Sequence, residues 1–178
     1  MKKLKFLWLA ALLLALLFTG CGGGDDGDSD TWHDITSSSQ LDGTWKGSIS
    51  ATKSMKEWIQ IWEWEWTAAE IDDFFGNMSL KITYDIALNI SSGHVTGTDK
   101  WTYAYSGGTI NTTWEEIKSW YTSVDSVNDS NHSLIFNDDI SFTYEEGDDD
   151  IQINQDGRKL KYDFDLDGVP MDMIMTKQ

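Results

Sequence analysis

Residues 78–90 read MSLKITYDIALNI and alternate apolar with polar side chains from end to end. Successive side chains of a β-strand point to opposite faces of the sheet, so this alternation predicts a strand with one buried face and one solvated face. Such a division is typical of antiparallel sheets. At about 3.3 Å per residue the strand would be about 40 Å long, which suits a tilted or bent barrel strand. Its apolar face comprises Met78, Leu80, Ile82, Tyr84, Ile86, Leu88 and Ile90.

Further runs with the same period lie on both sides of this stretch. Turn-forming pairs such as Asp156-Gly157 and Asp167-Gly168 separate some of them, and such pairs favour the positive φ angles of tight hairpins. Regular strands joined by short turns predict an all-β fold. We expect an antiparallel up-and-down β-barrel with one or two short helical segments. The further strands are expected at 44–51, 95–105, 140–144, 151–155, 160–166 and 169–176.

The segment 54–75 fits both a strand and a helix. Its W-x-W-x-W run at 62–66 would place three indoles on one face of a strand. As a helix, the segment would begin with a capping box formed by Ser54 and Glu57. The period-two run favours a strand over 58–67, followed by a loop or a short helical turn.

Residues 113–124 predict a short helix that could cover one end of the sheet. Thr113 and Glu116 have the spacing of a capping box, which would start the helix at this point. An apolar stripe with helical spacing supports the prediction. The stripe comprises Trp114, Ile117, Tyr121 and Val124.

The first 21 residues have the pattern of an export signal. Lysines at positions 2, 3 and 5 precede 13 apolar residues, 6–18, which are too few for the roughly 20 that span a bilayer. The segment ends Leu17-Phe18-Thr19-Gly20-Cys21 and resembles the lipobox of bacterial lipoproteins, with Phe18 where that pattern prefers leucine. The resemblance implies a signal peptide over 1–20, cleavage before Cys21, and a lipid on Cys21 that anchors the mature chain to a membrane.

The sequence divides the mature chain into a tether over 21–40 and a single domain over 41–178. The tether is rich in Gly, Asp and Ser and lacks apolar periodicity. Inner-membrane retention of lipoproteins goes with Asp directly after the cysteine; Gly22 stands there, which favours the outer membrane of a Gram-negative cell envelope. Removal of 1–20 removes three lysines and no acid, so the net charge falls from −17 to −20. Such a surface repels nucleic acid, and we expect no nucleic-acid partner.

The start of the predicted domain carries a second resemblance. Residues 41–47, LDGTWKG, are similar to the G-x-W opening strand of lipocalin-like barrels. In that family the tryptophan plugs the closed end of an eight-stranded barrel, and the barrel holds a small apolar ligand. The resemblance therefore implies a lipocalin-like barrel in which Gly43 and Trp45 are structural residues that do not contact ligand.

The high aromatic content supplies the candidate ligand-binding residues. On the inner faces of the predicted strands, aromatic rings could line a cavity for an apolar molecule or form a platform that stacks on sugar rings. The same alternation is expected of rings that only fill the core, because aromatic side chains bury large apolar areas. The candidate residues are Trp62, Trp64, Trp66, Tyr84, Trp101, Tyr103 and Tyr105.

Catalytic and metal-binding patterns are weak. The three histidines are scattered, and no H-x-x-E-H or G-x-S-x-G motif occurs, so we expect no enzyme activity and no cofactor. The run Asp163-x-Asp165-x-Asp167-Gly168 resembles the first half of a calcium loop. Its twelfth position, however, is Ile174, where such loops need a bidentate acid, so we predict no metal site.

Three functions remain open from the sequence. The first is a lipid-anchored, lipocalin-like envelope protein that binds a small hydrophobic ligand. The second is a surface module that binds glycans through a Trp/Tyr platform, which would show exposed coplanar rings. The third is a non-catalytic structural or partner-docking envelope protein, which would show a filled interior and an apolar exterior patch.

Overall fold

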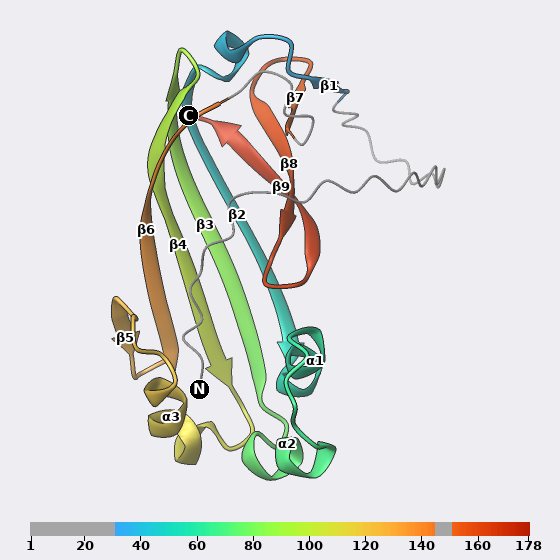
Figure 1. Ribbon diagram of the computed structural model, residues 1–178, viewed down its shortest axis with the longest axis vertical. Helices are drawn as coiled ribbons and strands as arrows, with labels where there is room; N and C mark the ends of the chain where they lie inside the picture. Colours follow the sequence, from blue (N-terminus) through green and yellow to red (C-terminus); the bar gives the residue numbers. More distant parts are fainter. Residues whose placement is uncertain (1–30, 145–150) are drawn as a thin grey trace.

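The computed structural model describes residues 31–144 and 151–178, which form one antiparallel sheet and three α-helices (Figure 1). The signal peptide, Cys21 and the first part of the tether lie outside the described residues. The strands are β1 (Trp32–Asp34), β2 (Gly43–Ser54), β3 (Ser79–Ser91), β4 (His94–Ser106), β5 (Ser126–Asn128), β6 (Ser133–Thr143), β7 (Ile151–Asn154), β8 (Lys159–Asp165) and β9 (Pro170–Lys177). The helices are η1 (Ser38–Leu41, 3₁₀), α1 (Met55–Ile61), α2 (Ala68–Phe74) and α3 (Ile110–Ser119).

The predicted mostly-β fold and its long central strand are confirmed. β3 pairs with β2 on one side and β4 on the other along its whole length, and β6 continues the meander beyond β4. At about 3.3 Å per residue these strands span about 40 Å. Leu80, Ile82 and Tyr84 are buried as the alternation requires. The other predicted strands are present with shifted ends, and that predicted at 140–144 is the last part of β6.

The prediction of a closed barrel is wrong. The strand order is β1-β7-β8-β9-β2-β3-β4-β6-β5, and β6 and β7 do not pair within the described residues. A closed barrel would need β7 to pair with β6, but β7 pairs with β1 instead. β9 pairs with only residues 45–47 of β2, and the β8–β9 hairpin then crosses in front of the sheet (Figure 1). The first strand therefore arises inside the predicted tether, and the hairpin covers the sheet in place of closure.

The predicted strand over 58–67 is also wrong, because this segment begins as α1. Ser54 and Glu57 form the capping box: the Ser54 hydroxyl accepts from the Glu57 backbone N–H, and the Glu57 carboxylate accepts from the Ser54 N–H. The helical alternative buries Met55 and Ile59 together with Trp58, whose indole N–H donates to the Leu80 carbonyl at 2.9 Å. These contacts outweigh the period-two run that follows.

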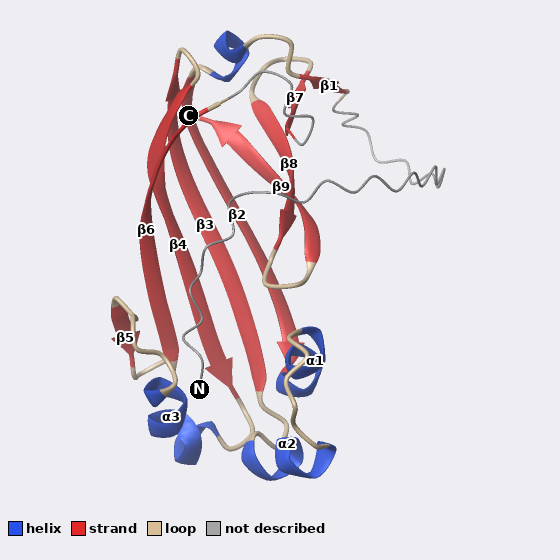
Figure 2. Ribbon diagram, viewed as in Figure 1, coloured by secondary structure: helices blue, strands red, loops and turns tan. Residues whose placement is uncertain are grey.

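The predicted helix near 113–124 is confirmed but starts and ends earlier, as α3. Its N-cap is Thr109, which makes no side-chain capping bond. Thr113 lies inside the helix, where its hydroxyl donates to the Thr109 carbonyl at 3.1 Å, so the predicted capping box is wrong. The described structure thus has all three α-helices at one end of the long strands (Figure 2).

The opposite end of the sheet is closed by Trp45 and η1. Trp45 is fully buried, and its indole N–H donates to the Leu41 carbonyl at 2.6 Å. The Lys177 ammonium lies 5.2 Å from the centre of the Trp45 ring, which is cation–π distance. Trp45 thus occupies a core position, as expected of a structural residue.

Gly97 of β4 allows the close packing of the central strands, and its replacement provides a test of this packing. A methyl group at Gly97 would overlap the backbone oxygen of Ala87 and lie 2.9 Å from Leu88 Cδ2. We expect Gly97→Ala to lower the free energy of unfolding by about 1–3 kcal/mol, as overpacking does. Urea unfolding measures the change, with Thr98→Val, an exposed neighbour, as the control. Equal stability of Gly97→Ala and wild type would show that β3 and β4 pack differently.

Candidate binding site

The structure divides the seven predicted ligand residues into two groups. Tyr84, Tyr103 and Tyr105 are buried on the inner face of the sheet, with Trp101 half-buried beside them. Trp62, Trp64 and Trp66 lie at the helical end, in and after the last turn of α1. The two groups occupy different parts of the molecule, although Trp62 and Tyr103 both lie beside the Asp167 carboxylate.

The inner aromatic residues pack against one another. Phe164 of β8 stacks on Tyr84 with ring centres 4.6 Å apart and planes 17° apart, and Trp101 lies 4.6 Å from the same tyrosine. Tyr103 adds contacts to Trp101 and Phe136. The rings thus pack against one another across part of the inner face, and Trp101, Phe136 and Phe164 remain only half-buried there.

Buried tyrosines on this face donate to carboxylates or to each other. Tyr84 donates to Asp99 at 3.1 Å, and Tyr105 shares a 2.7 Å hydrogen bond with Tyr121. Burial raises the pKa of Tyr84, and the nearby Asp99 carboxylate raises it further. Burial also raises the pKa of Asp99, although the hydrogen bond from Tyr84 opposes this shift. These hydrogen bonds satisfy the Tyr84 hydroxyl, whereas the second oxygen of the Asp99 carboxylate is buried without a hydrogen-bond partner among the described residues.

Asp167 connects the tip of the β8–β9 hairpin to the interior. It has φ of 56°, and its carboxylate accepts from the Tyr103 hydroxyl at 3.4 Å. Burial raises its pKa, while the adjacent Trp62 and the Tyr103 hydroxyl oppose the rise. The buried Trp62 indole N–H lies near this carboxylate but forms no hydrogen bond of normal geometry.

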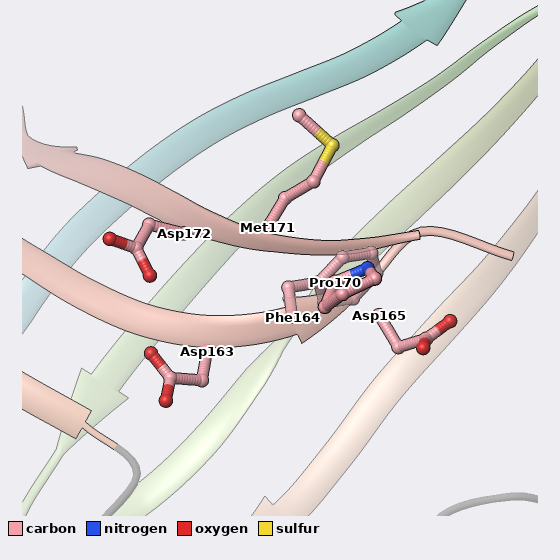
Figure 3. A pocket seen from close by; sticks show the side chains of 6 residues that line it. All are labelled: Asp163, Phe164, Asp165, Pro170, Met171 and Asp172. Atoms are coloured by element: carbon pink, nitrogen blue, oxygen red, sulfur yellow. The ribbon is translucent and has the colours of Figure 1, made fainter. Parts of the chain in front are cut away.

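The hairpin carries a surface hollow but no calcium cage. Asp163 of β8 and Asp172 of β9 are opposed across the hairpin, and the Asp165 carboxylate points away from both (Figure 3). Asp165 accepts from the Gly168 backbone N–H, whereas Asp167 turns inward to Tyr103. Among the described residues, no three His, Cys, Asp or Glu side chains gather in a way that could hold a metal ion.

The helical end carries an exposed group of rings, which we call the aromatic patch. It consists of Trp62, Trp64, Trp66, Phe74 and Trp120. Trp64 and Trp120 are 41% and 37% exposed, although large apolar side chains are usually buried. Trp120 packs against three of the others, with ring centres 5.4 Å from Phe74, 6.4 Å from Trp66 and 6.5 Å from Trp64. The cluster therefore has a packed base and two exposed rings.

The end of α1 fixes the position of Trp64. The Trp64 N–H donates to the Ile59 carbonyl and the Glu63 N–H to the Gln60 carbonyl, which is the Schellman pattern of helix termination. Glu63 takes the left-handed conformation, with φ of 54°, where glycine is favoured. This turn ends the helix and projects Trp64 from it.

The sequence prediction missed Trp120 and Phe74. Trp120 follows α3, and it lies off the apolar stripe predicted for that helix. A tryptophan off the buried stripe of an amphipathic helix is a signal of exposure that could have identified it. Phe74 sits at the end of α2, and only the tertiary structure brings it beside Trp120.

The aromatic patch and β1 lie at opposite ends of the molecule. Figure 2 shows β1 and η1 at the end remote from α1, α2 and α3. The tether would therefore join the folded part at the end farthest from the aromatic patch. Within the described residues, no helix has the length and apolar character needed to cross a membrane.

Comparison with known proteins gives no family assignment. No protein-family model matches the chain, and neither the curated proteins nor the solved structures include a match.

The raised pKa of Asp167 predicts a pH-dependent stability difference. A carboxyl group whose pKa is raised by folding favours the folded state most below its unfolded pKa, and this contribution is lost as pH rises through the folded pKa. Its usual pKa is 3.8, so the loss begins above that pH. Asp167→Asn keeps an acceptor for Tyr103 and removes the charge. We expect Asp167→Asn to become more stable relative to wild type when the pH is raised from about 3.5 to about 7, because only wild type then carries the poorly solvated charge.

Urea unfolding at both pH values measures this difference. Asp163→Asn, which changes an exposed carboxylate on the same hairpin, is the matched control and should show less change. An Asp167→Asn difference that does not vary with pH would contradict the desolvation of this half-buried carboxylate.

Proposed function

We propose that this chain is a non-catalytic cell-envelope protein, lipid-anchored at Cys21, that docks a macromolecular partner through the aromatic patch. One observation carries the proposal: Trp64 and Trp120 are exposed within a packed group of five aromatic residues. Of the three functions open from the sequence, docking is the one that expects an interior filled by its own side chains and an apolar exterior patch.

The energetics of exposed tryptophan support docking. Burial of apolar surface is worth about 25 cal/mol per Å², and aromatic rings bury large areas, so covering two indoles is strongly favourable. Tryptophan is enriched among the residues that dominate protein–protein binding. The rings of the aromatic patch pack against one another, and the hydrogen bonds that end α1 fix the Trp64 backbone, so less conformational entropy would be lost on binding.

The position of the aromatic patch suits an anchored protein. A Gly-rich linker of the length of residues 22–31 has a root-mean-square span of about 17 Å, and the long strands add about 40 Å. The aromatic patch lies at the far end of these strands from β1, which would allow an anchored chain to hold it away from the membrane.

Site-specific photocrosslinking tests the docking function. A photoreactive phenylalanine analogue at Trp64, in the full lipidated chain in its own membrane, should yield a discrete adduct. The same analogue at Phe142, which is 43% exposed on β6, is the control and should not. We expect Trp120→Ser to abolish the Trp64 adduct, because it removes the central ring of the patch. Identical products from both positions, or no adduct at Trp64, would contradict docking.

A small apolar ligand on the inner face is a second candidate function. Three aromatic rings are only half-buried there: Trp101, Phe136 and Phe164. Among the described residues β6 and β7 do not pair with each other, so the sheet stays open on this side. This function predicts saturable binding of an apolar fluorescent dye that Trp101→Leu weakens and Trp64→Ser does not. Absence of saturable binding, or equal effects of both changes, would contradict it.

A further inference from the structure

We propose that the partner of the aromatic patch is a cationic polypeptide segment, whose arginine or lysine side chains stack on Trp64 and Trp120. The inference rests on the docking function proposed above and specifies the chemistry of the partner. Three features of the helical end support it: the acidic rim, the orientation of the rings, and the affinity of indole faces for cations.

Four acidic residues lie next to members of the aromatic patch in the chain, and we call them the acidic rim. Glu63 and Glu65 flank Trp64, and Asp72 and Asp73 precede Phe74. All four side chains are exposed, and within the described part of the chain none of the four makes a hydrogen bond or ion pair. A basic segment would supply the missing counter-charges, and complementary charge both speeds association and selects the partner.

The lysines of this end leave the rim acidic. Lys118 of α3 is paired with Glu115 at 2.7 Å and with Asp129 at 3.0 Å. Lys53 and Lys56 lie at the end of β2 and in the first turn of α1. These segments thus carry three lysines, against the four rim carboxylates and five further acidic residues, Glu57, Glu70, Glu115, Glu116 and Asp129.

Exposed indole faces bind cations. A cation over a tryptophan ring gains about 0.5–1 kcal/mol at an exposed site and about 2 kcal/mol when desolvated. Two such contacts occur within the part of the chain that the structure describes, with Lys118 5.6 Å from the Trp114 ring centre and Lys177 5.2 Å from that of Trp45. Arginine suits the aromatic patch best, because a guanidinium can stack on an indole and pair with a carboxylate at the same time.

The ring geometry disfavours a glycan. A sugar-binding platform would show coplanar exposed rings, but the Trp64 and Trp120 planes are 80° apart and the Trp66 and Trp120 planes 67° apart. Rings at such angles offer separate faces to separate side chains. An anionic membrane surface is disfavoured as well, because the acidic rim would be repelled.

Glu63 provides a variant that separates binding from folding. Its left-handed backbone is the conformation that glycine adopts without a steric penalty at a helix end. Glu63→Gly should therefore keep or raise the melting temperature while removing one rim charge. Combined with Glu65→Gln, it removes both carboxylates that flank Trp64. Asp138→Asn with Asp139→Asn, both exposed on β6, removes the same charge elsewhere.

The test uses a rhodamine-labelled hexa-arginine peptide and fluorescence anisotropy, with the full chain purified in neutral detergent. We expect saturable binding that weakens at least about tenfold in Trp64→Ser/Trp120→Ser and in Glu63→Gly/Glu65→Gln. We expect Asp138→Asn/Asp139→Asn and Phe142→Ser to change the Kd less than about twofold. Melting temperatures near or above wild type in the binding variants would show that loss of binding is not loss of fold.

Three results would overturn the inference. Equal weakening by the two charge-removing variants would mean that the peptide binds only to the overall negative charge. Saturable binding of neutral chitohexaose that requires Trp64 and Trp120 would assign the aromatic patch to a glycan. If the peptide does not bind but the Trp64 photocrosslink forms, the cationic partner is rejected and the docking function stands. If neither occurs, both proposals are rejected.

Discussion

The structure depends on the need to cover the apolar inner face of a long sheet that does not close on itself. β2, β3, β4 and β6 form a surface about 40 Å long, and one face carries nearly all the large apolar side chains of β3. The β8–β9 hairpin covers one part of this face, where Phe164 stacks on Tyr84. The helices cover the remaining end, where Trp58 is fully buried and bonded to the Leu80 carbonyl.

This way of covering the sheet has a consequence for binding. In a closed barrel, inward aromatic residues can surround a cavity, whereas here the hairpin places Phe164 against the inward rings Tyr84 and Trp101. The helices that cap the sheet are short, and their last residues cannot all reach the interior. Trp64 and Trp120 follow the ends of α1 and α3 and remain exposed. The aromatic surface thus arises at the helix ends, with acidic residues on the same segments.

Much of the sheet could be predicted from the sequence because strand periodicity is local. The 78–90 run has one unambiguous period, and its strand forms as expected. The 58–67 run has no single period, since its tryptophans fit both a strand and a helix. The Ser54–Glu57 capping box starts a helix there. The site was only partly predictable: Trp62, Trp64 and Trp66 lie in the aromatic patch, but Phe74 and Trp120 join them through contacts between α2 and α3. The open sheet was not predictable, because the pairing of β1 with β7 joins residues more than a hundred positions apart.

Acrylamide quenching of tryptophan fluorescence tests most directly the claim that the interior rings are packed and the patch rings exposed. Acrylamide is neutral, so the negative charge of the protein does not repel it. Wild type should show a quenchable component, and Trp64→Phe/Trp120→Phe should lower the quenchable fraction more than Trp32→Phe/Trp101→Phe, which replaces two half-buried rings. If Trp64→Phe/Trp120→Phe lowered the quenchable fraction no more than Trp32→Phe/Trp101→Phe, the rings of the aromatic patch would not be the most accessible tryptophans of this protein.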